Sequence, residues 1–149
     1  MPPVYPLQWQ PATWRGHYEN MAKRDRAVWD RFLAMFSDNF QAFAYNVALG
    51  GLELQGTNIS DEEILGWRYT TALKIDVVGQ AADLYWIIEV RPEAQVSALG
   101  AALTYSLVAK RDEVFPGRLI PTIVCYTMQV DARWAAEKLG VQVVTVPPE

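Results

Sequence analysis

The sequence contains very few of the residues that most often build disulfides and metal sites. Among its 149 residues there is one cysteine, Cys125, and one histidine, His17. A single cysteine excludes an intramolecular disulfide and a multi-cysteine metal site, so a reducing compartment is the expected environment. Cys125 lies in an apolar run and is expected to be a buried, inert thiol. His17 has no second histidine or cysteine beside it, which makes it a poor metal ligand and gives no basis for a serine–histidine–aspartate triad.

The chain also lacks an excess of positive charge and any long hydrophobic run. Its formal net charge is −4 and its pI is about 5.0, so contact with DNA requires a local basic patch. No segment approaches the roughly 18 to 20 apolar residues needed to cross a bilayer, and the first residues do not have the pattern of a signal peptide. We therefore expect neither secretion through a signal peptide nor a membrane partner.

The residues that are abundant predict one α/β domain, residues 17–149, preceded by an N-terminal arm, residues 1–16. A hydrophobic content of 51% supplies ample material for one core. In the arm, four prolines alternate with large apolar side chains, and proline disfavours both a helix and a central strand. The large side chains are Tyr5, Leu7, Trp9 and Trp14. Their burial requires another surface, either on the chain's own domain or on a partner.

Periodic patterns in the rest of the chain predict the element order αβββαβαβ. Apolar residues at helical spacing indicate a first helix, and alternating residues indicate a hairpin that ends at Pro92. The expected helices are 19–36, 97–111 and 131–139, and the expected strands are 43–49, 73–77, 84–90, 119–127 and 141–146. Ser60 and Glu63 have capping-box spacing and predict a short helical turn before the hairpin. Helices between the later strands imply parallel pairs, and hence a mixed sheet.

Two carboxylates in the predicted hairpin are candidates for chemistry. Asp76 and Glu89 fall on the polar sides of two adjacent strands whose other sides face a core. A carboxylate in such apolar surroundings is costly unless it is paired or bound to a metal. Two carboxylates and a backbone carbonyl form a suitable oxygen set for Mg²⁺, which could polarise a phosphodiester and activate water. The alternative is an ion-pair network, with Asp76 paired to Lys74 or Glu89 to Arg91.

The stretch KIDVVGQAADLYWIIEVRPEAQVSALGAALTY, residues 74–105, resembles the core of the PD-(D/E)xK, or restriction-endonuclease-like, superfamily. The resemblance extends over about residues 40–146 and implies a mixed β-sheet flanked by helices. It also implies that Asp76 and Glu89 are the two acidic residues of the signature. A third family carboxylate is expected from the first helix, where Glu19, Asp25 and Asp30 all remain possible.

The chain departs from the family pattern at two positions. Arg91 stands where the family has lysine, and arginine is bulkier, always charged and unable to act as a base. Ala101 stands where related active nucleases often have glutamine. Both changes predict an impaired catalytic site on an intact fold, in which Asp76, Glu89 and Arg91 are catalytic, and Mg²⁺ is bound, only if activity survives.

The sequence is also similar, more loosely, to small phage proteins that pair an aromatic, proline-bearing N-terminus with this core. It therefore suggests a phage virion or assembly protein, found in the host cytoplasm and then in the particle. In this interpretation Tyr5, Leu7, Trp9 and Trp14 bind other virion proteins or a second copy. The alternative is a Mg²⁺-dependent DNA endonuclease for phage DNA processing or repair. A nucleic-acid-binding module without catalysis is a third possibility, which the acidic net charge disfavours.

Overall fold

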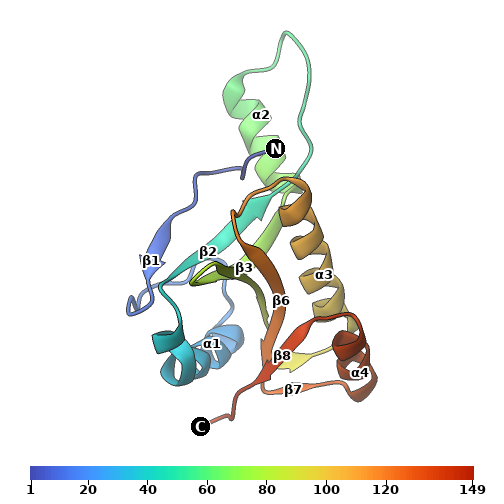
Figure 1. The fold of residues 1–149 in the computed structure, drawn as a ribbon. Coiled ribbons are helices and arrows are strands. Elements are labelled where there is room, and N and C mark those ends of the chain that lie inside the picture. Colours follow the sequence, from blue (N-terminus) through green and yellow to red (C-terminus); the bar gives the residue numbers. More distant parts are fainter.

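The computed structural model describes residues 1–149 and contains a six-stranded mixed sheet with helices on both faces (Figure 1). The strands of the sheet, in spatial order, are β1 (Trp9–Pro11), β2 (Ala42–Leu49), β3 (Leu73–Ala81), β4 (Leu84–Val90), β6 (Arg118–Cys125) and β8 (Gln142–Thr145). The helices are α1 (Lys23–Phe36), α2 (Asp61–Thr71), α3 (Val96–Arg111) and α4 (Val130–Lys138), with a 3-10 turn, η1 (Ser37–Asn39). Two short strands, β5 (Glu93–Ala94) and β7 (Thr127–Met128), pair separately.

Neighbouring strands pair antiparallel from β1 to β4 and parallel from β4 through β6 to β8. The parallel pairs are those whose connections contain α3 and α4, as expected for crossovers that pass over the face of a sheet. This arrangement confirms the predicted mixed sheet flanked by helices. None of the helices is long and apolar enough to cross a membrane.

Both faces of the sheet are buried, because helices cover each of them. Helix α1 packs its apolar stripe, including Trp29 and Phe32, against one face, which contains Ile88 and Val90 of β4. Helices α3 and α4 cover the other face through small residues such as Ala102 and Ala136. Glu89 was predicted on a polar side of β4, yet its residue is 1% exposed. The prediction missed this burial because alternation along one strand does not show that the opposite face is also covered.

The predicted facing of β3 is wrong at one position. Regular alternation would place Ile75 and Val77 on the same face, but Ile75 joins the core beneath α3 and Val77 the core beneath α1. The β2–β3 ladder skips the pair Asn46 and Asp76, and Asn46 has a φ of 50°. A left-handed residue in β2 at this point changes the local twist. The side chains that follow it therefore point to the opposite face of the sheet from the one that regular alternation would give.

The N-terminal arm lies along the outer edge of the sheet. Trp9, Gln10 and Pro11 pair with β2, and the backbone amide of Val4 donates a hydrogen bond to Ala48 at 3.0 Å. The position of Pro11 on an edge strand is consistent with its missing amide donor. Trp9 packs against Tyr85, at 6.1 Å between ring centroids. Most of the arm is therefore packed against the domain of the same chain.

Helix α2 projects beyond the rest of the domain (Figure 1) and contains no buried residue. Its predicted start is confirmed, because the Ser60 side chain accepts a hydrogen bond from the Glu63 amide at 3.1 Å. The helix is longer than the predicted short turn. Helices α3 and α4 each start one residue before the expected helices 97–111 and 131–139, and Gln95 and Gln129 occupy the two N-cap positions.

Candidate functional site

The candidate site lies where β3 and β4 separate. Their regular ladder ends at the pair Val77 and Ile88, one residue before Asp76 and Glu89 would face each other. In place of the next ladder bond, the Asp76 Oδ2 atom accepts a hydrogen bond from the Val90 amide at 2.9 Å. The Asp76 carboxylate is thus fixed between the diverging strands, beside Glu89. The irregularity at Asn46 and Asp76 and the end of this ladder position the two carboxylates together.

A single guanidinium nitrogen joins the oxygen atoms of this site. The Nη1 atom of Arg91 lies 3.0 Å from Glu89 Oε1, 3.2 Å from Asp76 Oδ2 and 2.7 Å from the Val90 carbonyl oxygen. Of the two ion pairs proposed from the sequence, the pair of Glu89 with Arg91 is formed, and Arg91 also contacts Asp76. Lys74 instead donates to the carbonyls of Tyr69 and Ala72.

One oxygen of Glu89 receives no hydrogen bond from a donor. Its Oε2 atom is buried, and no N–H or O–H group of the protein donates to it. Burial, followed by the hydrogen bond and the charge of Asp76, raises the pKa of Glu89 to about 9, although Arg91 acts in the opposite direction. The short distance to Arg91 suggests an ionised Glu89, whereas the pKa indicates a neutral one. We favour the neutral form without a metal, because Arg91 supplies one positive charge and Asp76 already balances it.

Of the three acidic residues proposed for the third carboxylate, Asp25 is the one that acts on this site. Burial raises the pKa of Asp25, while the charge of Arg91 lowers it and that of Asp76 raises it. Asp30 instead raises the pKa values of Tyr18 and Tyr45, after the larger effect of burial. Glu19 lines a separate pocket. The first turn of α1 therefore brings Asp25 toward the diverging strands, and the other two candidates lie elsewhere.

Sequence reasoning missed Tyr105 of α3. Burial raises the pKa of Tyr105, and the charges of Glu89 and Asp76 raise it further, while Arg91 lowers it. The side chain therefore lies within electrostatic reach of the site. Tyr105 follows Ala101 by four residues, so the two lie on the same side of the helix. This spacing could have predicted the position of Tyr105, because the family resemblance places residue 101 on the side of the helix that faces the site.

The donor set is compatible with Mg²⁺, but it is sparse. No group of three or more acidic, histidine or cysteine side chains is arranged to hold a metal ion. Asp76 and Glu89 provide two carboxylates, Val90 provides a carbonyl, and the unsatisfied Glu89 Oε2 lacks a positive partner. Mg²⁺ suits such a site because it commonly keeps several waters and binds only one or two protein carboxylates.

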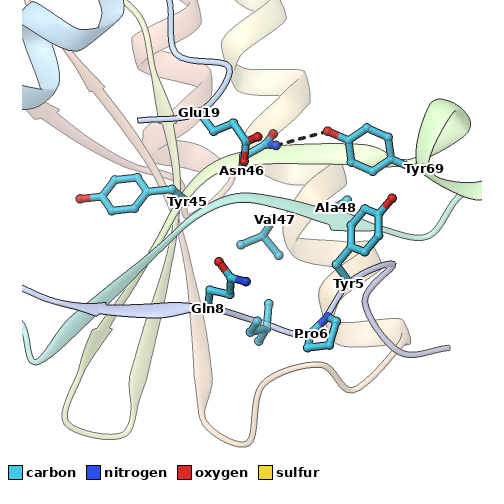
Figure 2. A pocket seen from close by; sticks show the side chains of 10 residues that line it. Tyr5, Pro6, Gln8, Glu19, Tyr45, Asn46, Val47, Ala48 and Tyr69 are labelled. Atoms are coloured by element: carbon cyan, nitrogen blue, oxygen red, sulfur yellow. Dashed lines mark hydrogen bonds between the residues drawn. The ribbon is translucent and has the colours of Figure 1, made fainter. Parts of the chain in front are cut away.

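A pocket of about 400 Å³ separates the arm from β2 and does not include the carboxylate site. The arm leaves β2 between its contacts at Val4 and Trp9, and Tyr5, Pro6 and Gln8 line the gap (Figure 2). On the opposite wall, the Asn46 amide donates a hydrogen bond to the Tyr69 hydroxyl at 3.4 Å.

The four arm residues proposed to bind a partner have contacts within the chain. Leu7 and Trp9 pack against the core beneath α3, and Trp14 packs against the core beneath α1. Tyr5 is 48% exposed and lies 5.4 Å from Tyr69 between ring centroids. Binding of a partner by these residues stays a prediction, and only Tyr5 offers a large exposed apolar side chain for it.

No protein-family model matches the chain, and no curated protein matches it in sequence. Two solved structures are similar in fold. One is a repair endonuclease from Pyrococcus abyssi, with a TM-score of 0.51 and 12% identity over 88% of this chain and 50% of that one. The other is an EndoMS–dsDNA2 complex, with a TM-score of 0.48 and 15% identity over 91% of this chain and 50% of that one. The chain spans about half the length of these two proteins. Together with the mixed sheet, the first similarity shows that the chain has the restriction-endonuclease-like nuclease fold predicted from its sequence.

Proposed function

We propose that this chain acts on DNA as a Mg²⁺-dependent endonuclease whose site is formed by Asp76, Glu89 and Arg91. The observation that carries this proposal is the buried Glu89 Oε2 atom, which lies beside a second carboxylate and receives no hydrogen bond from a protein donor. A buried carboxylate oxygen without a partner is costly, and a divalent cation would satisfy it. With both carboxylates ionised, the site would carry two negative charges against the single positive charge of Arg91.

Each residue has a distinct proposed role. Asp76 and Glu89 hold the ion, and the Val90 amide keeps Asp76 in place. The bound ion supplies Lewis-acid polarisation of a phosphodiester and a more acidic water. Arg91 binds the substrate phosphate, because a guanidinium is a strong phosphate ligand but cannot serve as a general base. Asp25 contributes negative charge from α1, and Tyr105 offers a hydroxyl on the α3 side.

DNA is the proposed substrate for two reasons. The fold is that of a structure described as a repair endonuclease, although this similarity by itself concerns the fold. In addition, Lys23 and Arg24 are exposed at the start of α1, next to Asp25 in the sequence. Arg24 is paired with Glu93, so a phosphate would have to compete with that carboxylate for it, whereas Lys23 forms no ion pair. A local cluster of this kind is what an acidic protein needs in order to approach a phosphate backbone.

Neither the fold nor the comparisons support the phage virion role suggested by the sequence. One ground for that interpretation was an arm that docks on a partner, whereas the arm pairs with β2 of its own sheet. The endonuclease is therefore the function we carry forward.

The test is cleavage of supercoiled plasmid and of mismatched or branched duplexes with Mg²⁺ or Mn²⁺. We expect slow nicking by the wild-type protein and none by Asp76→Asn or Glu89→Gln, which preserve side-chain size. Arg133→Met is the matched control, because Arg133 lies on α4 and contacts Glu137 rather than the site. Activity that persists in both carboxylate variants would indicate a contaminating nuclease and would remove the support for this proposal.

A further inference from the structure

We infer that Arg91 couples DNA binding to metal binding, because its guanidinium occupies the position of the cation until a DNA phosphate draws it away. This inference rests on the proposed function and concerns the regulation of the same site. It makes the metal site dependent on substrate, so that the ion binds well only when a phosphodiester is present.

The first step is that the oxygens that contact Arg91 Nη1 are also those that would hold the metal ion. The oxygens that contact Arg91 Nη1 come from Glu89, Asp76 and the Val90 carbonyl, at 3.0, 3.2 and 2.7 Å. These are two carboxylates and a carbonyl, the same donor set that suits Mg²⁺. One set of oxygens cannot surround a guanidinium nitrogen and a divalent ion at once, since the two cations repel each other at such distances. Metal binding therefore requires Arg91 to leave.

The second step is that Arg91 can leave without moving the backbone. Its amide donates a hydrogen bond to the Val124 carbonyl at 3.0 Å, which holds the main chain beside β6. Its side chain is 39% exposed, whereas that of Glu89 is 1% exposed. The guanidinium thus reaches solvent from a fixed backbone position, while the carboxylate beneath it stays buried. Rotation about side-chain bonds is sufficient to open the site.

The third step is that Arg91 retains free donors for a phosphate. All its hydrogen bonds and ion pairs within the chain use Nη1. The Nε and Nη2 atoms have no acceptor in the protein, and a planar guanidinium can bind a phosphate through two such parallel donors. A phosphodiester at the mouth of the site therefore competes with Glu89 and Asp76 for Arg91.

Thermodynamic linkage makes this effect reciprocal. If DNA raises the affinity for the metal by some factor, the metal raises the affinity for DNA by the same factor. The lysine of the family pattern is a more compact point charge without the planar set of donors of a guanidinium. The coupling between DNA binding and metal binding therefore depends on the arginine that replaces it in this chain.

The experiment is a titration of Mn²⁺ followed by electron paramagnetic resonance of the free ion. Wild type, Arg91→Met and Arg133→Met are compared with and without a short duplex whose phosphorothioate linkages resist cleavage. We expect the duplex to tighten Mn²⁺ binding by wild type about tenfold or more, within the usual range of coupling between sites. Arg91→Met should bind Mn²⁺ about tenfold more tightly than wild type without DNA, and the duplex should change its affinity little. Arg133→Met, which removes an arginine of similar exposure, 43% against 39%, should behave as wild type.

The outcomes separate the inference from the proposed function. If wild type without DNA binds Mn²⁺ as tightly as Arg91→Met, Arg91 does not exclude the metal, and the inference is wrong while the endonuclease proposal stands. If no protein binds Mn²⁺ with or without the duplex, both are wrong. Thermal unfolding establishes that Arg91→Met is folded. Arg91→Lys provides a second variant that keeps the charge, and it should also lose much of the dependence on DNA.

Discussion

Asp76 of β3 accepts a hydrogen bond from the backbone amide of Val90 in β4 at 2.9 Å, through the same oxygen that contacts Arg91. A side chain here takes the place of a ladder bond that the diverging strands no longer form. Asp76 therefore has a structural and a proposed chemical role, and the two can be separated by substitution.

We expect Asp76→Ala to lower the free energy of unfolding by about 1 to 3 kcal/mol, because the Val90 amide loses its acceptor. Asp76→Asn should cost less, since the amide oxygen can still accept from Val90 although the negative charge is lost. Urea denaturation measures both values, and plasmid nicking should be absent in both variants. Equal destabilisation by the two substitutions would mean that the charge on Asp76, rather than its hydrogen bond to Val90, supports the fold.

The raised pKa of Glu89 predicts that stability without metal falls as pH rises. The folded protein binds a proton that the unfolded chain releases near its usual pKa of 4.5, and the folded state loses it only near a pKa of about 9. Stability from this group is therefore complete below 4.5 and decreases as pH rises toward 9, by an amount on the order of a few kcal/mol.

Glu89→Gln, a neutral residue of the same size, should flatten this dependence and stabilise the protein at alkaline pH. Urea denaturation at pH 5, 7 and 9 in the presence of a chelator measures the difference between wild type and variant. Glu137→Gln is the control, because the Glu137 side chain is 67% exposed on α4. Parallel curves for wild type and Glu89→Gln would show that Glu89 is ionised in the folded protein.

Much of the fold could be predicted because its strands have simple, local patterns. Alternation along β4 and the proline after it predicted a hairpin with Glu89 near its end, and the spacing of helices between later strands predicted the parallel pairs. The family resemblance then matched Asp76 and Glu89 to the signature, and the structure brings these two residues together. Local spacing is sufficient for these features since each depends on residues close in the chain.

The remaining features depend on contacts between distant segments. Asparagine favours the left-handed region, but its presence in β2 does not by itself show that the ladder breaks at Asn46, opposite Asp76. The choice of Asp25 over other acids of the first helix required the angle at which α1 meets the sheet. The burial of Glu89 required knowledge that a helix covers its face. The contact of Arg91 with both carboxylates follows from these same tertiary relationships.

The core role of β4 is tested by Ile88→Ala. Ile88 is fully buried beneath α1, and its truncation should cost about 2 to 5 kcal/mol through lost burial and a cavity. Leu107→Ala provides the control, because Leu107 is 66% exposed on α3 and should change stability by less than about 0.5 kcal/mol. Chemical denaturation gives both values. A cost below about 1 kcal/mol at Ile88 would indicate that β4 has shifted by one residue.

The N-terminal arm contributes packing and hydrogen bonds to the domain. Val4 is 6% exposed and Ala12 8% exposed, and both lie within the arm removed by deleting residues 1–16. Trp9 also contacts Phe115, at 6.3 Å between ring centroids. Removing the arm exposes these surfaces and leaves the edge of β2 unpaired, and an unpaired edge strand readily pairs with another chain.

We therefore expect deletion of residues 1–16 to lower the melting temperature by several degrees, which corresponds to about 2 kcal/mol or more for a domain of this size. The truncated protein should also self-associate more than the full chain, as measured by size-exclusion chromatography with light scattering. Tyr5→Ala is the matched control, because a side chain that is 48% exposed should contribute little to stability. The prediction would be wrong if the truncated protein kept its melting temperature and self-associated less than the full chain. The arm would then bind a partner, as the sequence suggested, and its packing on β2 would contribute little to the stability of the domain.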